Sequence, residues 1–168
     1  ENMNDVCRAC HGQSYVDSFW IQYDSLIEEY HVKFADPGLA LMALAKPLLK
    51  PVGFSNKIDF IWFELWHHEG RRARHAASMQ GPDYTHWHGT YEIAKHWYTK
   101  FVPELEHIIE DGASSSDPTR VEAAKALREG LDKVLNSPEH RWYLGKMTPE
   151  EKAERERRAK EFQERYSK

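Results

Sequence analysis

The amino-acid sequence predicts an all-α fold, a bundle of long helices. Between Gln13 and Lys33, apolar residues recur every three or four positions, which is the spacing of one buried helix face. Ser55-Asn56 provides an N-cap for a second long helix, which is expected to run to about Gln80. Almost no segment alternates with the period of a strand, so helices account for nearly the whole expected fold.

Prolines and glycines mark where the expected helices end. Ala35-Asp36-Pro37-Gly38 is expected to end the first helix, and Gly81-Pro82-Asp83 is expected to make a sharp bend. Thr148-Pro149-Glu150-Glu151 is a good N-cap for a last helix whose many charged residues predict a solvated or protruding rod. The other expected helices run from Leu39 to Leu49, from near Tyr84 to about Ile109 with at most an interruption at Pro103, and from Thr119 to Leu135.

Length and composition indicate one globular domain. The chain has 168 residues, and 40% of them are hydrophobic, which is enough to bury a core. Its net charge of −4 comes from interspersed acidic and basic residues, so nucleic acid is not an expected partner. No stretch is apolar enough to predict a membrane span. The N-terminus has neither the basic start nor the apolar core of a signal peptide, which predicts a mature or trimmed chain.

Both cysteines of the chain fall in one motif, Cys7-Arg8-Ala9-Cys10-His11. This Cys-x-x-Cys-His pattern is typical of haem c attachment. Cys7 and Cys10 can add to the two vinyl groups at one edge of the porphyrin, and His11 then becomes the proximal iron ligand. Haem c is assembled outside the cytoplasm, so the expected location is the periplasm or an equivalent lumen.

Two other chemistries use closely spaced cysteines. A thioredoxin-like redox pair normally follows a strand in a βαβ unit, and no strand pattern precedes Cys7 here. Structural zinc usually needs a second pair of Cys or His ligands at finger spacing, and the sequence has no second cysteine pair. Haem attachment is therefore the favoured interpretation.

The chain has ten histidines, and the nine besides His11 are more than ordinary structural use requires. A low-spin haem needs a second axial ligand, which can come from a distant part of a multihaem protein. His68 and His75 are seven residues apart and share a helix face, whereas His86 and His88 point in nearly opposite directions from a helix. Taken singly, each of these histidines fits a hydrogen-bonded structural residue better than a ligand.

Three arginines lie among these histidines. The guanidinium groups of Arg71, Arg72 and Arg74 are suited to bind haem propionates. The alternative is that the same arginines form surface salt bridges with Glu64 and Glu69.

Two runs of residues carry a family resemblance. The segments 62–75 (WFELWHHEGRRARH) and 79–92 (MQGPDYTHWHGTYE) resemble the C-terminal region of octahaem hydroxylamine oxidoreductases, above all the anammox enzymes that oxidise hydroxylamine or hydrazine. The resemblance covers roughly Asp5 to Ile109, with Cys7 to His11 in the place of the last haem motif of the family. It implies a multihaem cytochrome c helical bundle, with residues 1–54 around the haem motif, 55–110 as a long helix pair and 111–168 as trailing helices.

The resemblance implies a function for several residues. Members of the family carry eight haems c in one chain, and one of these haems is catalytic and is cross-linked by a tyrosine from a neighbouring subunit of a trimer. Tyr84 is the expected cross-linking residue, with Tyr91 as second choice. His88 is the first choice for a distal haem ligand, and His75 and His86 are the alternatives.

The chain departs from the family in having a single attachment motif. It is therefore expected to be the C-terminal helical part of a longer chain whose upstream multihaem domain holds the other haems. The reaction that the resemblance implies is oxidation of hydroxylamine to nitric oxide or nitrite, or of hydrazine to dinitrogen, with a c-type cytochrome or similar protein as electron acceptor. The location that it implies is the periplasm or the anammoxosome lumen. The haem on Cys7 and Cys10 is expected to relay electrons rather than to bind substrate.

Other classes of protein stay open at this point. A reductive relative that acts on nitrite or hydroxylamine would look similar but would lack the cross-linking tyrosine. A stand-alone monohaem cytochrome would place an internal ligand such as Met79 on its own iron and would not need the additional histidines. The helices after Ile109 contain no candidate chemistry, so they are also compatible with a purely structural role.

Overall fold

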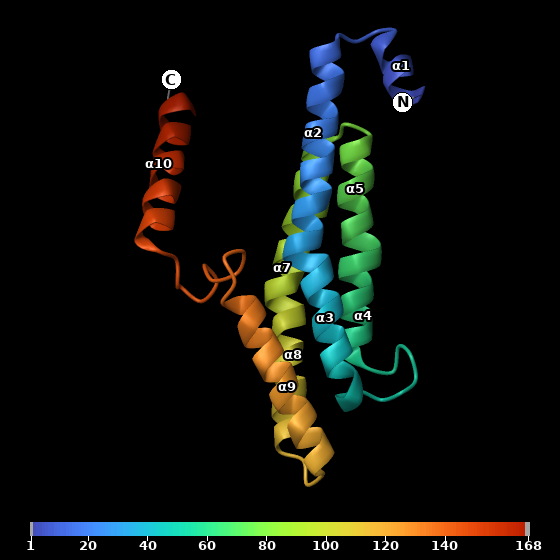
Figure 1. Cartoon of the computed structure of the whole chain (residues 1–168), viewed down its shortest axis with the longest axis vertical. Helices are drawn as coiled ribbons and strands as arrows, with labels where there is room; N and C mark the ends of the chain where they lie inside the picture. The colour runs from blue at the N-terminus through green and yellow to red at the C-terminus, as the bar shows by residue number, and fades with distance from the viewer. Residues whose placement is uncertain (1, 167–168) are drawn as a thin grey trace. The chain divides into compact units, whose positions relative to one another are not determined.

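The computed structural model describes residues 2–166, and it confirms the all-α prediction: these residues form helices and turns without a strand (Figure 1). The chain divides into two compact units, Glu1–Gly130 and Leu131–Lys168. The first unit begins with a short helix, α1 (Asn2–Arg8), which carries Cys7. Three long helical segments and most of α9 (Pro118–Leu135) make up the rest of it.

The first long segment continues past the point where the sequence predicts its end. It consists of α2 (Gln13–Tyr30), a π-helical turn (His31–Ala35), α3 (Asp36–Ala45) and a final 3₁₀ turn (Lys46–Leu48). The predicted break at Ala35-Asp36-Pro37-Gly38 is therefore wrong. Pro37 lies in the first turn of α3, where a proline is tolerated. Gly38 packs in a helix interface instead, because a Cβ there would overlap the ring of Trp62.

The second long segment begins at the predicted cap. Asn56 and Asp59 form a capping box, in which the Asn56 backbone N–H donates to Asp59 Oδ2 at 3.1 Å. The helix then runs through α4 (Lys57–Phe63), a π-helical turn (Glu64–Glu69) and α5 (Gly70–Ser78). Its buried face follows the three- and four-residue spacing of a helix, with these members: Ile58, Ile61, Leu65, Glu69, Ala73 and Ala76.

The third long segment follows the predicted bend at Gly81-Pro82. Gln80 has a φ of 55°, and the chain reverses there before α6 (Pro82–Thr85). The segment continues through π-helical turns at His86–Thr90 and Trp97–Phe101, with α7 (Tyr91–His96) between them, to α8 (Val102–Ala113). Pro103 lies in the first turn of α8 and does not interrupt the helix, which ends four residues beyond the predicted Ile109.

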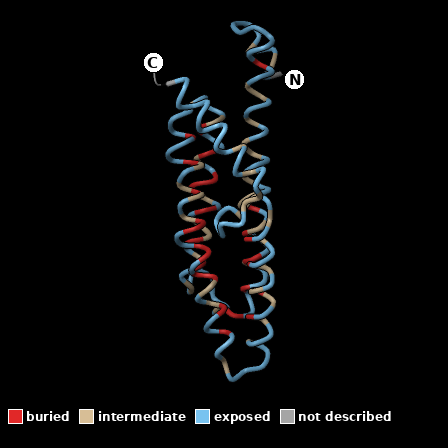
Figure 2. The backbone as a smooth tube through the Cα atoms, turned by 90° about the vertical axis from the view of Figure 1, so that its left-hand side faces the viewer, coloured by how far each residue is buried: buried red, intermediate tan, exposed pale blue. Residues whose placement is uncertain are grey.

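The core of the first unit lies between these segments, away from the N-terminal end. Trp97, Phe101, Leu105 and Ile58 are completely buried there. In contrast, Val16 is the one buried residue of α2, and Figure 2 shows few buried positions along the stretch next to the N-terminus. The half of the unit that carries the cysteine motif therefore has little core of its own.

The second unit ends in α10 (Pro149–Tyr166). The predicted N-cap is confirmed, because Thr148 and Glu151 exchange hydrogen bonds of 2.8 and 3.2 Å between backbone N–H groups and side chains. Most side chains of α10 are exposed, as its charge predicts, and the ring of Phe162 is 64% exposed. Among residues 2–166, no helix has both the length and the apolar character that a membrane crossing requires.

Candidate functional site

The cysteine motif forms a single helical turn at the end of α1. The backbone N–H groups of Cys10 and His11 both donate to the Cys7 carbonyl, at 3.2 and 2.9 Å. Both thiols are unpaired, and Cys10 and the His11 ring are exposed. No atom outside the immediate chain neighbours lies within 4 Å of a Cβ built on Gly12, so the next position is also open. One exposed turn thus presents two thiols and an imidazole, which is the donor set that haem c requires.

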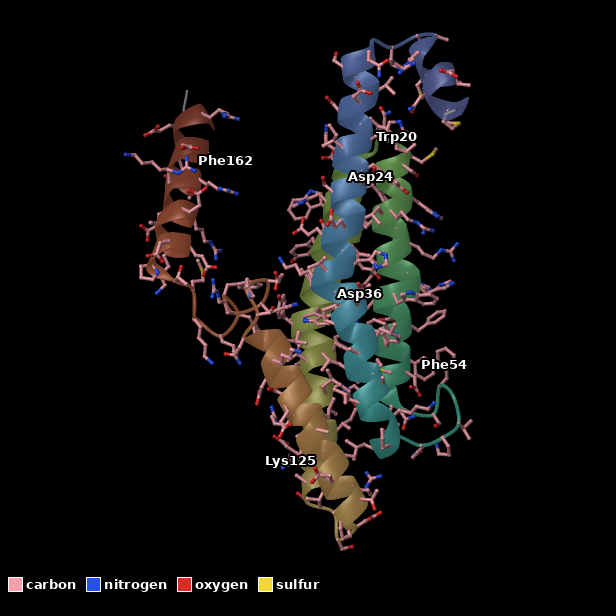
Figure 3. The ribbon with its side chains drawn as sticks, viewed as in Figure 1. Trp20, Asp24, Asp36, Phe54, Lys125 and Phe162 are labelled. Atoms are coloured by element: carbon pink, nitrogen blue, oxygen red, sulfur yellow. The ribbon has the colours of Figure 1, made fainter. Side chains whose placement is uncertain are left out.

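Contacts with the first two long segments hold this turn. The indole Nε1 of Trp20, on α2 in Figure 3, donates to Asn4 Oδ1 of α1 at 2.5 Å. The His11 ring stacks on Tyr15, with ring centroids 4.4 Å apart and an interplanar angle of 17°. The Tyr15 hydroxyl in turn donates to the side chain of Gln80, just after α5. The turn is therefore fixed against both helices while its thiols stay accessible.

A hollow of about 580 Å³ lies beside α5 and α6, within the usual volume range of ligand sites. We call it the histidine–arginine hollow, and it is lined by His67, His68, Arg71, Arg72, His75, Ala76, Met79, Gly81 and Tyr84. Four of these lining residues are candidates from the sequence: Arg71, Arg72, His75 and Tyr84. None of the lining residues is acidic, so the hollow favours an anionic group such as a carboxylate.

Arg71 and Arg72 contact residues other than Glu64 and Glu69, the salt-bridge partners considered from the sequence. Arg72 forms an ion pair with Glu92 at 2.7 Å, and Arg71 lies 3.0 Å from Nε2 of His67. Neither Glu64 nor Glu69 is paired with these arginines. Arg74 is exposed and does not line the hollow, so it lies apart from Arg71 and Arg72 in this respect.

Tyr84 and His88 lie next to each other. Their ring centroids are 4.8 Å apart, and Tyr84 is 52% exposed at the edge of the hollow. His88 Nδ1 is also 3.8 Å from a carboxylate oxygen of Glu92. Tyr91, the second choice for the cross-link, is exposed, contacts the ring of Trp87 at 5.6 Å and does not line the hollow.

His86 lies in a different hollow from His75. This second hollow, of about 510 Å³, lies between α2 and the α5–α6 turn and has an aromatic wall that includes Tyr15 and Phe19. His86 and His88, two residues apart, therefore face different surroundings. Both belong to a π-helical turn, as do His67 and His68. Such turns are frequent at functional sites, because the additional residue per turn changes the direction of side chains.

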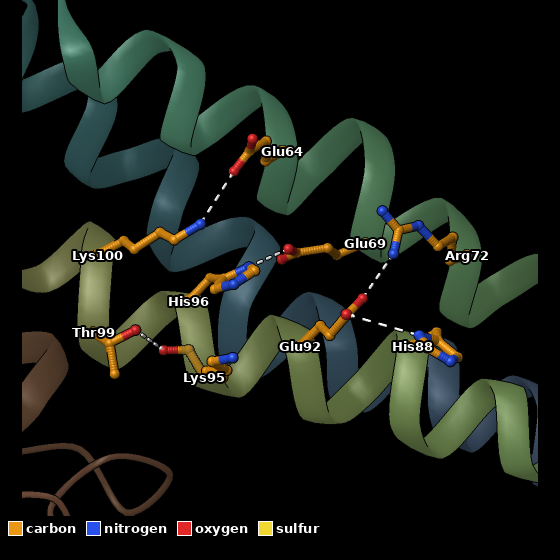
Figure 4. Close-up of polar contacts among 9 residues, drawn as sticks. All are labelled: Glu64, Glu69, Arg72, His88, Glu92, Lys95, His96, Thr99 and Lys100. Carbon is orange, nitrogen blue, oxygen red and sulfur yellow. Dashed lines mark hydrogen bonds and ion pairs between the residues drawn. The ribbon is translucent and has the colours of Figure 1, made fainter.

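A largely buried pair, Glu69 and His96, was missed by the sequence reasoning. Glu69 is 3% exposed, and its Oε1 is hydrogen-bonded to His96 Nδ1 of α7 (Figure 4). Its Oε2 is buried without a hydrogen-bond partner. Burial raises the pKa of Glu69, while the hydrogen bond from His96 lowers it. The available signal was a charged residue at a core position of the helix, between Leu65 and Ala73.

Ion pairs and a tyrosine surround this buried pair. Glu92 pairs with Arg72 on one side, and Glu64 pairs with Lys100 at 3.5 Å on the other (Figure 4). On the side of α2, the Tyr30 hydroxyl packs against Gly70. Burial, and next the Glu69 carboxylate, raise the pKa of Tyr30 to about 12.

Comparison with known proteins identifies no relative of this chain. No family model, no curated protein and no solved structure matches the chain. Inferences about function therefore depend on the cysteine motif, the two hollows and the charged groups between the helices.

Proposed function

We propose that the chain is the C-terminal helical part of a multihaem c-type oxidoreductase that oxidises hydroxylamine or hydrazine. The observation that carries this proposal is the exposed turn with two unpaired thiols and an adjacent imidazole. In this proposal Cys7 and Cys10 hold the haem through thioether bonds, and His11 is its proximal ligand. When bound, haem c supplies reversible one-electron transfer.

The histidine–arginine hollow is proposed to receive part of a further haem, carried by the upstream domain or by a neighbouring subunit. The guanidinium groups of Arg71 and Arg72 would bind its propionates, which agrees with a lining that has no acidic residue. Arg74, which is exposed outside the hollow, is a weaker candidate for the same role. His88 remains the first choice for a distal ligand, with His75 inside the hollow and His86 in the second hollow as alternatives.

Tyr84 is the proposed site of the inter-subunit cross-link in a homotrimer. Its ring is half exposed at the edge of the hollow, where a neighbouring subunit can approach. Tyr91 is equally accessible but lies outside the hollow. A cross-link of this kind would hold the catalytic haem of the neighbouring subunit and favour oxidation over reduction.

Exposed apolar side chains support a covered position within a larger protein. Trp66, Trp87 and Met79 are 53%, 56% and 82% exposed, on the same segments as the histidine cluster. Large exposed aromatic side chains are suited to contact with another protein surface or with a haem. The proposed partners are the upstream multihaem domain, the other subunits of the trimer and, for the electrons, a c-type cytochrome in the periplasm or an equivalent lumen.

Denaturing gel electrophoresis of the natural full-length protein, with haem staining, tests this proposal. The expected result is a haem-stained species at a multiple of the subunit mass. Tyr84→Phe should abolish that species, and the control variant Tyr91→Phe should retain it. A haem-stained single subunit that Tyr84→Phe does not change would instead favour the reductive relative or a cytochrome that only transfers electrons.

A further inference from the structure

A small polar cavity lies beside the buried pair Glu69–His96. Its volume is about 170 Å³, and its wall includes His68 and Arg72, which also line the histidine–arginine hollow. At the other end its wall includes Glu64 and Lys100, whose side chains are 51% and 43% exposed. The cavity therefore borders the hollow on one side and groups open to solvent on the other.

One oxygen of the carboxylate in this cavity lacks a donor. Oε2 of Glu69 is buried without a hydrogen-bond partner, although buried polar atoms in folded proteins nearly always have one. A polar cavity of this volume has room for several water molecules, and a small rotation of the Glu69 carboxyl group, which lines the cavity, would let them donate to Oε2. Water is therefore the ligand that fits both the unsatisfied oxygen and the size of the cavity.

We propose that Glu69 and His96 form a proton-transfer site, in which water in the small polar cavity exchanges protons between the histidine–arginine hollow and the solvent. A proton that leaves the hollow binds water and then Glu69, and one proton is released toward the exposed end of the cavity. Each transfer breaks one N–H or O–H bond and forms another, and no electron moves. The use of the site in catalysis rests on the proposed function, since oxidation of hydroxylamine or hydrazine releases protons.

The charges around the pair suit this role. The titratable and charged groups that face it from the packed segments are Tyr30, Glu64, His68, Arg72, Glu92 and Lys100. Arg72 is paired with Glu92 and Lys100 with Glu64, so the ion pairs of these two cations are with carboxylates other than Glu69. Burial first, and then the charges of Glu92 and Glu64, favour the protonated carboxyl, while His96 opposes them. Both protonation states of Glu69 thus have stabilising groups nearby.

Infrared difference spectra of the natural full-length protein, recorded as the pH is changed, test the site directly. The wild type should have a carboxylic-acid band that persists to higher pH than an ordinary glutamate allows. Glu69→Gln should remove this band, and Glu122→Gln, the same change at an exposed glutamate of α9, should retain it. His96→Leu should move the midpoint of the band to higher pH, because it removes the hydrogen bond and the charge by which His96 lowers the pKa of Glu69. A spectrum without such a band, or a band that survives Glu69→Gln, would overturn the proposal.

Turnover of the same full-length variants tests the transfer step. Glu69→Gln should lower kcat on the order of tenfold, with KM unchanged and with a larger solvent isotope effect, because proton transfer becomes slower. Glu122→Gln should leave both constants unchanged. If Glu69→Gln removes the infrared band but leaves kcat and the isotope effect unchanged, the transfer role is wrong. If the wild type oxidises neither substrate, the proposed function fails, and the infrared result still decides whether Glu69 binds the proton.

Discussion

Gly89→Ala tests how closely α5 and the turn His86–Thr90 must approach to form the site. Gly89 is buried, and a Cβ at this position would lie 2.7 Å from Cα and 2.8 Å from Cβ of Ala73. These atoms belong to the backbone of α5 or are attached directly to it, so they cannot move aside as a flexible side chain does. The two helices must therefore separate, which would also shift Tyr84 and His88 relative to the hollow.

The expected loss of stability follows from two opposing terms. Overpacking of a close contact costs about 1–3 kcal/mol, and the rigid neighbour at this position favours the upper end of that range. Replacing glycine by alanine within a helix regains about 1 kcal/mol. The net destabilisation expected for Gly89→Ala is therefore about 2 kcal/mol.

Gly130→Ala is the matched control. It makes the same change in α9, but its Cβ would overlap only the tip of a flexible side chain, Cδ1 of Leu44 at 2.5 Å, and would lie in ordinary contact with Cδ2 of Leu41 at 3.6 Å. This variant should be unchanged or up to about 1 kcal/mol more stable. Urea unfolding followed by circular dichroism measures both variants. If Gly89→Ala is as stable as Gly130→Ala, the close helix contact is not a constraint and the reasoning is refuted.

Three further substitutions test other parts of the fold. The pKa of Tyr30, about 12, lies above its ordinary value of 10.0, so the folded protein keeps this proton where the unfolded chain loses it, and stability falls between pH 10 and 12. Over this range the free energy of unfolding of the wild type should fall by up to about 2 kcal/mol more than that of Tyr30→Phe. The control Tyr91→Phe should follow the wild type. Asn56→Ala removes the N-cap of α4 and should lower the free energy of unfolding in urea by about 1 kcal/mol, and no change would contradict its capping role. Gly38→Ala should lower it by about 1–3 kcal/mol and change the near-ultraviolet circular dichroism of Trp62, and an unaltered spectrum would contradict the proposed contact.

Local signals in the sequence predicted the helix starts and the main bend well. The capping residues Asn56 and Thr148 act on their own first turns, and the reversal at Gln80 lies directly before the predicted bend at Gly81-Pro82, so no distant contact was needed to find them. The predicted end at Pro37 was wrong for the opposite reason. A π-helical turn carries the helix into α3, and Gly38 packs against the ring of Trp62, which is distant in the chain.

The candidate site could be predicted only in part. The density of His and Arg pointed to the region, and the structure brings His75, Arg71 and Tyr84 to one hollow. The pair Glu69–His96 joins residues 27 positions apart on two different segments. Its burial depends on which helix packs opposite, and the period of a single helix does not contain that information.

Intact mass spectrometry of the chain, produced with haem c maturation in an extracytoplasmic compartment, tests the central claim most directly. The account predicts a mass increase of one haem for each chain, retained under denaturing conditions. A variant with both Cys7→Ser and Cys10→Ser should lose this added mass, because no thioether bond can form. An unmodified mass for the wild type, or haem retained covalently by the double variant, would contradict the account.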